Sequence, residues 1–256
     1  MFGVFGLCWL VLGCAGGRGY DPVQLGLADP KSSIQGLQPF EQSPGHCGAA
    51  ALATVLDWTG LEVSPQSLGP LVYDPQRKGS LQASMKAAAR RHGRLAYEIQ
   101  GRDELLHEVA AGHPVIVLQN LGLSWHPVHH YAVVSGFDLN QGVVFLLSGQ
   151  TSSEVEDVGV FDATWSRAGS WGLLVLRPEE PPARPGKSRY IKAILGLEQA
   201  GRTQAAARGY EAYLSLWPED QSAMLGLANC AYLSGDLQKA ADVLTRAVEV
   251  HPESSA

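Results

Sequence analysis

Gln42, Cys47 and His130 together supply the side chains that acyl transfer by a thiol requires. Cys47 stands where a Pro/Gly-containing loop enters an Ala-rich helix expected over 46–58, and the positive end of a helix dipole favours thiolate over thiol. Gln42 can aim its amide at the same place and form an oxyanion hole with the backbone N–H of Cys47. His130 begins an expected strand, which can hold an imidazole against the thiol. A lone cysteine at a helix start is usually structural, whereas this ordered set indicates nucleophilic catalysis.

The surrounding pattern predicts an α+β domain with helices first and antiparallel strands later. Helices are expected over 46–58, 80–92 and 102–111, with Ser80 as the N-cap of the second and Gly60, Gly93 and Gly112 as stops. Strands are expected over 114–119, 131–137, 143–148 and 171–176. Residues 138–142 have the composition of a hairpin loop, so His130 would lie on a β-hairpin.

A repeat with a period of 34 residues follows a Pro-rich linker at 179–187. The matched positions are Gly201 and Gly235, Ala206 and Ala240, Pro218 and Pro252, Tyr190 and Met224, and Tyr210 and Leu244. This spacing resembles the tetratricopeptide repeat, in which small residues let two antiparallel helices approach and Pro ends the second one. We expect an all-α tail of two repeats over 188–256, packed on the first domain or on a protein partner. Cys230 lies in this tail and is expected to be a buried small residue.

The N-terminal apolar run over residues 2–15 ends in Val11-Leu12-Gly13-Cys14. It is too short to span a bilayer comfortably as a mature helix but fits the apolar region of a signal peptide. Its end resembles the lipobox of bacterial lipoprotein precursors, which implies a signal peptide at 1–13 and lipid attachment at Cys14. No Lys or Arg precedes the run, so a buried N-terminal helix is the alternative. Residues 14–35 would form a flexible tether, and Ala15 implies an outer-membrane lipoprotein that faces the periplasm.

Composition excludes several classes of partner and cofactor. The formal net charge is −6, and the one basic cluster, Arg90-Arg91 with Arg94, suits the end of a helix, so nucleic acid is not an expected partner. The four cysteines form no CxxC pair and no Cys/His spacing suited to zinc. His126 and His129 suggest a metal site, but no carboxylate or third histidine stands at a matching spacing. We therefore expect no metal and no cofactor.

A resemblance to the C39 and C39-like peptidases is carried by Gln42, by Cys47-Gly48 and by His130-Tyr-Ala-Val-Val-x-Gly-Phe-Asp. These segments are most similar to stand-alone bacterial lipoproteins that fuse such a domain to tetratricopeptide repeats. The resemblance implies a papain-like domain over 36–178, with N-terminal helices packed on an antiparallel sheet. It also implies papain-type chemistry, in which Cys47 is the nucleophile, His130 the general base and acid, and Gln42 an oxyanion donor.

The sequence departs from this family where a carboxylate should orient the histidine. C39 peptidases place an Asp on the strand after the His, and the corresponding segment here is Leu147-Ser148-Gly149. Closing the hairpin with 139–141 as its loop puts His130 opposite Gln150 and leaves Ser148 on the same face. Ser148 is therefore the expected catalytic partner of His130, with Gln150 behind it. Asp138 shares that face but lies about 26 Å away at about 3.3 Å per residue.

The leading hypothesis is a cysteine peptidase that cleaves a peptide or small exported protein, with the tail recruiting substrate or partner. The main alternative is a non-catalytic peptide-binding scaffold lipoprotein, which the missing Asp favours and the retained Gln42, Cys47 and His130 oppose. A cell-wall amidase of the related NlpC/P60 type also uses Cys and then His. The position of Gln42 upstream of Cys47 favours the C39 type over that amidase.

Overall fold

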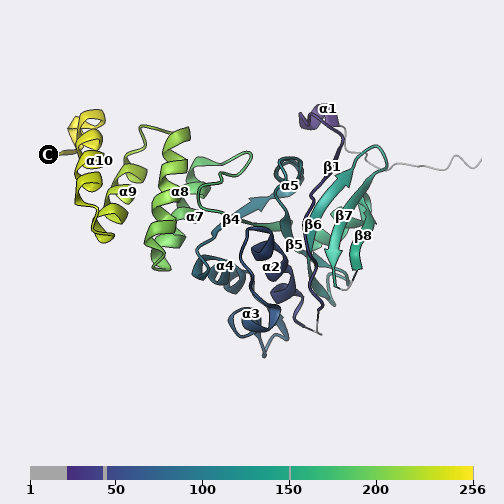
Figure 1. Cartoon of the computed structure of the whole chain (residues 1–256). Helices are drawn as coiled ribbons and strands as arrows, with labels where there is room; N and C mark the ends of the chain where they lie inside the picture. Colours follow the sequence, from purple (N-terminus) through teal and green to yellow (C-terminus); the bar gives the residue numbers. More distant parts are fainter. Residues whose placement is uncertain (1–21, 43–44, 150, 256) are drawn as a thin grey trace, which may run out of the picture.

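An antiparallel sheet organises the chain up to Leu176 (Figure 1). The computed structural model describes residues 22–42, 45–149 and 151–255, so the expected signal peptide and its Cys14 lie outside the described residues. The sheet has the order β4-β9-β5-β6-β7-β8, and β1 pairs with the end of β6. In that order the strands are β4 (Leu95–Gln100), β9 (Trp171–Leu176), β5 (Val115–Asn120), β6 (His129–Asp138), β7 (Val143–Ser148) and β8 (Thr151–Asp157), and β1 is Lys31–Ser33.

Each face of the sheet buries its own apolar core, because side chains alternate along every strand. Ile116 and Val133 belong to the core under the N-terminal helices, whereas their neighbours Val117 and Val134 belong to the core on the opposite face. The helices of the first face are α2 (Cys47–Trp58), α3 (Pro65–Val72) and α4 (Gln82–Arg91), and those of the second are α5 (Gly101–Ala110) and α6 (Val158–Arg167). The expected α+β class, with N-terminal helices packed on an antiparallel sheet, is confirmed.

Helix α2 is the helix that carries Cys47, and its Ala-rich sequence explains its central place. All residues from 48 to 56 are buried, because small side chains let the helix lie close to its neighbours, β6 among them. The helix ends at Thr59, and Gly60 follows with φ +83°, the left-handed conformation that glycine adopts most readily. The helix and the stop expected from the sequence are both confirmed.

Ser80 does not cap α4, contrary to the sequence expectation. It pairs with Tyr73 in a short hairpin formed by β2 (Tyr73–Asp74) and β3 (Gly79–Ser80). Leu81 takes the N-cap position of α4 instead and offers no side-chain acceptor. The strand pairing extends the backbone at Ser80 and leaves its side chain to pack against the start of α2.

Several other elements gave no clear signal in the sequence. Strand β8 lies at the edge of the sheet and exposes polar residues such as Ser153 and Glu154. Its sequence therefore lacks the apolar pattern that predicts a strand. Helices α3 and α6 and strand β4 were likewise not expected. The tether expected to reach residue 35 also differs from the structure, because Lys31–Ser33 pairs with residues 136–138 as β1.

The tail consists of helical hairpins stacked beside the sheet domain (Figure 1). Its helices are α7 (Lys187–Gln199), α8 (Thr203–Leu216), α9 (Gln221–Leu233) and α10 (Leu237–Val250), followed by the short turn η1 (Pro252–Ser255). Gly201 and Gly235 end the first helix of each hairpin with φ +70° and +81°, as the 34-residue period requires. A Cβ on Gly226 would sit 2.3 Å from the ring of Tyr210, so glycine permits the close packing of α8 and α9. None of the described helices is both long and apolar enough to cross a membrane.

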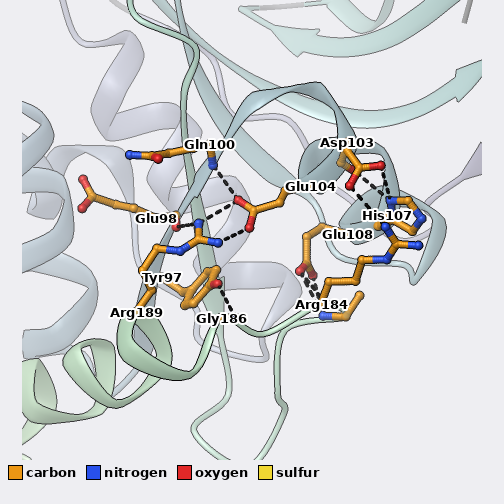
Figure 2. A network of polar contacts seen from close by, with 11 residues as sticks. Tyr97, Glu98, Gln100, Asp103, Glu104, His107, Glu108, Arg184, Gly186 and Arg189 are labelled. Atoms are coloured by element: carbon orange, nitrogen blue, oxygen red, sulfur yellow. Dashed lines mark hydrogen bonds and ion pairs between the residues drawn. The ribbon is translucent and has the colours of Figure 1, made fainter. Parts of the chain in front are cut away.

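Helix α5 fastens the linker and the tail to the sheet domain (Figure 2). Glu108 is 1% exposed, and its carboxylate accepts hydrogen bonds from the backbone N–H of Ala183 at 2.9 and 3.0 Å. Glu104 forms a bidentate ion pair with Arg189 of α7, and Tyr190 of α7 packs edge-on against Tyr97 of β4 at 6.5 Å. The tail therefore shares both polar contacts and apolar core with the first domain, as expected.

Candidate active site

Cys47 is the first residue of α2, and its half-buried thiol sits at the positive end of that helix. His46, at the N-cap, offers no side-chain hydrogen bond to the first turn. Gly48 follows because the hairpin comes very close here: a Cβ on Gly48 would lie 2.5 Å from both Cβ and Oγ of Ser80. The small residue after the cysteine thus lets one wall of the site approach the helix start.

A cavity of about 940 Å³ opens beside this helix start and brings three of the expected residues together. Gln42, Cys47 and His130 all line it. The other lining residues are Gly45, Arg77, Lys78, Gly79, Ser80, Leu81, Gln82, Leu118, Pro127, His129 and Tyr131. Segments more than 80 residues apart therefore meet at one cleft, which is large enough to receive a stretch of peptide.

The fourth expected residue, Ser148, lies behind His130. Its Oγ is 2.7 Å from Nε2 of His130, a hydrogen-bond distance between β6 and β7. The pairing of Val133 with Leu147 has the register expected from the sequence. Gln150, expected behind Ser148, lies outside the described residues.

This register arises from two compensating irregularities rather than from the simple hairpin expected. The loop holds four residues, 139–142, instead of three, because Asp138 pairs with Val143. A β-bulge between Val134 and Gly136 then shifts the ladder by one residue. Without that bulge the longer loop would move Ser148 out of register with His130.

Burial shapes the acid–base behaviour of His130. Desolvation lowers the pKa of His130 below its ordinary value, while the charge of Glu154 on β8 opposes this effect. A lowered pKa keeps the imidazole neutral at pH 7 and able to accept a proton. In the tautomer whose Nε2–H donates to Oγ of Ser148, Nδ1 is the ring nitrogen that can accept that proton.

Tyr131 is a residue of the site that we did not single out from the sequence. Its hydroxyl donates to the backbone carbonyl of Ser80 at 3.1 Å, and its ring meets Trp171 edge-on at 6.0 Å. Burial raises the pKa of Tyr131, and the nearby Cys47 adds to the effect. The sequence could have indicated Tyr131 through its position next to His130 on a strand, because adjacent side chains on a strand point to opposite faces of the sheet. Tyr131 ties the histidine strand to the hairpin that flanks Cys47.

The remaining residues weighed in the sequence lie away from this chemistry. Asp138 pairs with Lys31 and accepts from the backbone of the 139–142 loop. Cys230 is buried in the tail, and burial raises the pKa of its thiol to about 11. His129 lines the cleft, but no group of three or more metal-ligating side chains occurs in the part of the chain that the structure describes.

Both parts of the chain are similar to known protein families. Residues 34–171 match the Peptidase_C39-like family, and residues 192–255 match the tetratricopeptide repeat. The chain belongs to the Peptidase_C39-like family. In this C39-like domain Cys47 is the first residue of α2 and His130 is the second residue of β6, and the tetratricopeptide tail follows the domain.

Solved structures similar to this C39-like chain are matched over nearly their whole length. A C39-like peptidase from Bacillus anthracis is 18% identical, with a TM-score of 0.49 over 58% of this chain and 98% of that chain. The peptidase domain of Streptococcus ComA, a bifunctional ABC transporter of a quorum-sensing pathway, is 20% identical, with a TM-score of 0.47 over 55% and 98%. A double-glycine-motif protease from an AMS/PCAT transporter, bound to its leader peptide, is 20% identical, with a TM-score of 0.42 over 56% and 96%. No curated protein matches the chain.

Proposed function

We propose that this C39-like protein is a cysteine peptidase that cleaves a peptide or small exported protein by acyl transfer. The observation that carries the proposal is the convergence of Gln42, Cys47 and His130 on one cleft, with Ser148 hydrogen-bonded to the far side of the imidazole. A nucleophile, a base and a group that orients the base form the arrangement that thiol catalysis needs.

The proposed reaction follows from the roles of these groups. Nδ1 of His130 takes the proton of the Cys47 thiol as the sulfur attacks the scissile carbonyl. The resulting oxyanion accepts hydrogen bonds from the Gln42 amide and the Cys47 backbone N–H. The C–N bond then breaks, and His130 gives its proton to the leaving amine. Water, deprotonated by His130, hydrolyses the thioester and restores the thiol.

Ser148 acts in this scheme as a positioning residue. Its hydroxyl fixes the tautomer and orientation of His130 through Nε2. A hydroxyl stabilises an imidazolium less than a carboxylate does, because it carries no charge. The resting site is therefore best described as a neutral imidazole beside the thiol, consistent with the lowered pKa of His130.

The tail is proposed to recruit the protein substrate or a partner protein. Tetratricopeptide repeats are interaction modules, and the last helical hairpin exposes large apolar side chains such as Tyr232, Leu233 and Leu237. Deleting the whole tail would uncover the core that it shares with β4, so substitution is the better test. Tyr232→Ala with Leu237→Ala should weaken turnover of the natural protein substrate and leave hydrolysis of a short peptide intact. Equal effects on both substrates would show that these residues are structural.

We further propose that the protein is an exported lipoprotein, anchored through Cys14 at the outer membrane and facing the periplasm. The support is the lipobox-like sequence before Cys14. Two acyl chains would give stable anchoring. The intact mass of the purified protein should correspond to a chain starting at Cys14 with attached lipid. A mass that retains residues 1–13, or an unlipidated cysteine at the N-terminus, would exclude the anchor.

A second candidate function is a peptide-binding scaffold with an unreactive cleft. The observation that favours it is Ser148, which stands where a carboxylate would stabilise the imidazolium. A mixture of peptides with defined sequences, analysed by mass spectrometry, distinguishes the two functions. The peptidase predicts new peptide termini with the wild-type protein and none with Cys47→Ala. The scaffold predicts binding of the same peptides without cleavage.

A further inference from the structure

The loop between β5 and β6 exposes an unusual concentration of large apolar side chains. Trp125 is 80% exposed, and Leu121, Leu123 and Val128 are 50%, 56% and 51% exposed. They fall within eight consecutive residues, 121–128, which we call the Trp125 loop. Scattered exposed apolar residues are ordinary, but a contiguous group marks a binding surface.

The Trp125 loop is held in one shape by its own hydrogen bonds. Leu123 and His126 exchange backbone hydrogen bonds at 3.2 and 3.1 Å, and the N–H of Leu121 donates to the carbonyl of Val128 at 2.9 Å. A Cβ on Gly122 would lie 2.4 Å from the carbonyl oxygen of His126, so the turn closes tightly around this glycine. The exposed tryptophan therefore stands on a folded turn.

Asn120, at the base of the loop, clamps its two ends. This residue is 2% exposed, and its Oδ1 accepts hydrogen bonds from the backbone N–H of Gly122 and of Val128, both at 3.0 Å. Arg167 of α6 donates from Nε and Nη2 to the carbonyl of Asn120. The buried Asn120 side chain therefore fixes the conformation of a solvent-exposed loop. A loop fixed in this way presents its apolar residues in a constant position.

The Trp125 loop is continuous with the cleft of the proposed active site. Pro127 of the loop and His129, the first residue of β6, both line the cavity that Cys47 and His130 also line. Trp125 is two residues from Pro127. A peptide that leaves the cleft over Pro127 would therefore pass close to the turn that carries the tryptophan.

We propose that the Trp125 loop is a substrate subsite that binds a large apolar or aromatic side chain of the peptide in the cleft. The inference rests on the proposed function and names its substrate class: peptides with such a side chain near the scissile bond. An indole offers a large rigid surface at low conformational cost, and tryptophan is among the residues that dominate binding energies.

A membrane surface is the other occupant that an exposed tryptophan and leucines can suit. Elements that lie on lipid usually add Lys or Arg to their apolar residues, and the sequence from 121 to 129 contains neither. The loop also shares Pro127 with the cleft, so burying it in lipid would obstruct the approach to Cys47. The observations favour peptide.

The test measures binding, not cleavage, so that it stands apart from catalysis. The full-length Cys47→Ala protein, with and without Trp125→Ala, is used to select from a random dodecapeptide display library. Peptides bound by Cys47→Ala should be enriched in large apolar residues. A representative peptide should bind about tenfold more weakly when Trp125 is Ala. Trp125→Phe should retain most of the binding, and Val160→Ala, which removes a 52% exposed apolar side chain on α6, should change nothing.

Three results would overturn the subsite, and a fourth would separate it from the proposed peptidase activity. Enrichment and affinity that are unchanged by Trp125→Ala would exclude it, even if the wild-type protein proves to be a peptidase. No enrichment at all would exclude it as well. Co-sedimentation with phosphatidylethanolamine/phosphatidylglycerol vesicles that depends on Trp125, without an effect on peptide binding, would assign the loop to a membrane. A scaffold that binds peptides through Trp125 but cleaves none would retain the subsite and refute the peptidase.

Discussion

The two walls of the cleft are built in different ways. The Cys47 wall depends on local sequence: a loop enters a helix, and Gly48 admits the neighbouring hairpin within 2.5 Å of where its Cβ would be. The His130 wall depends on pairing between β6 and β7, where a bulge and a four-residue loop together set the partner of the imidazole. The proposed nucleophile is thus placed by a helix terminus and the proposed base by strand register. Substitutions in the Cys47 wall and in the His130 wall should therefore have different effects.

The largest effects on peptide hydrolysis are expected from substituting Cys47 and His130 themselves. Cys47→Ala removes the sulfur that forms the thioester, and His130→Ala removes the group that moves its proton, so each should reduce peptide hydrolysis to background. Release of a fluorescent product from any peptide cleaved by the wild type measures this. Cys230→Ala, in the tail, is the matched control and should retain the wild-type rate. Hydrolysis that survives Cys47→Ala would assign the reaction to another residue.

The Cys47 wall is tested separately by crowding it. Gly48→Ala places a methyl group within 2.5 Å of Ser80, so β3 must shift, and we expect a loss of about 1–3 kcal/mol in the free energy of unfolding. Chemical denaturation measures the loss. Gly79→Ala is the control in the same hairpin, because its Cβ would come no closer than 3.8 Å to its nearest neighbour. If both variants unfold alike, the close approach at Gly48 is unimportant.

The His130 wall is tested by changing the orienting group. Ser148→Ala should reduce kcat/KM about tenfold, equivalent to about 1.4 kcal/mol, because the imidazole loses its orientation but keeps its chemistry. Ser148→Asp should be tolerated or should increase the rate, since a carboxylate stabilises the imidazolium. Steady-state kinetics on both variants decide. A Ser148→Ala variant as inactive as Cys47→Ala would mean that the serine does more than orient, and no effect would place the orienting group elsewhere.

The smallest expected effect concerns pH. His130 must be neutral to accept the thiol proton, and its lowered pKa means that kcat/KM should stay high to a pH below that of an ordinary histidine before it falls. Glu154 raises that pKa, so Glu154→Gln should move the acid side of the profile further down by a fraction of a pH unit. Ser148→Asp should move it up. A profile that none of these charges moves would exclude His130 as the group that titrates.

The sequence predicts the features that depend on neighbouring residues and misses most of those that depend on distant contacts. The helix that begins at Cys47, its stop at Gly60 and the tail repeats were predictable, because helix ends and repeat spacings depend on residues that are close in the sequence. The contact of Ser148 with His130 was expected on the assumption of a three-residue loop, and the structure reaches it through a longer loop and a compensating bulge. Ser80 was misassigned because pairing with Tyr73, several residues away, overrides its preference for a helix N-cap. The Trp125 loop gave no periodic signal, since its shape comes from the buried side chain of Asn120.

The central claim is that Cys47 is a nucleophile activated by His130, and its alkylation rate tests this without any substrate. Iodoacetamide is added near neutral pH, and peptide mapping by mass spectrometry follows each thiol. We predict rapid modification of Cys47 that slows markedly in His130→Ala, while Cys230, buried and with a raised pKa, reacts slowly in both proteins. Equal rates at Cys47 in the two proteins would contradict the account.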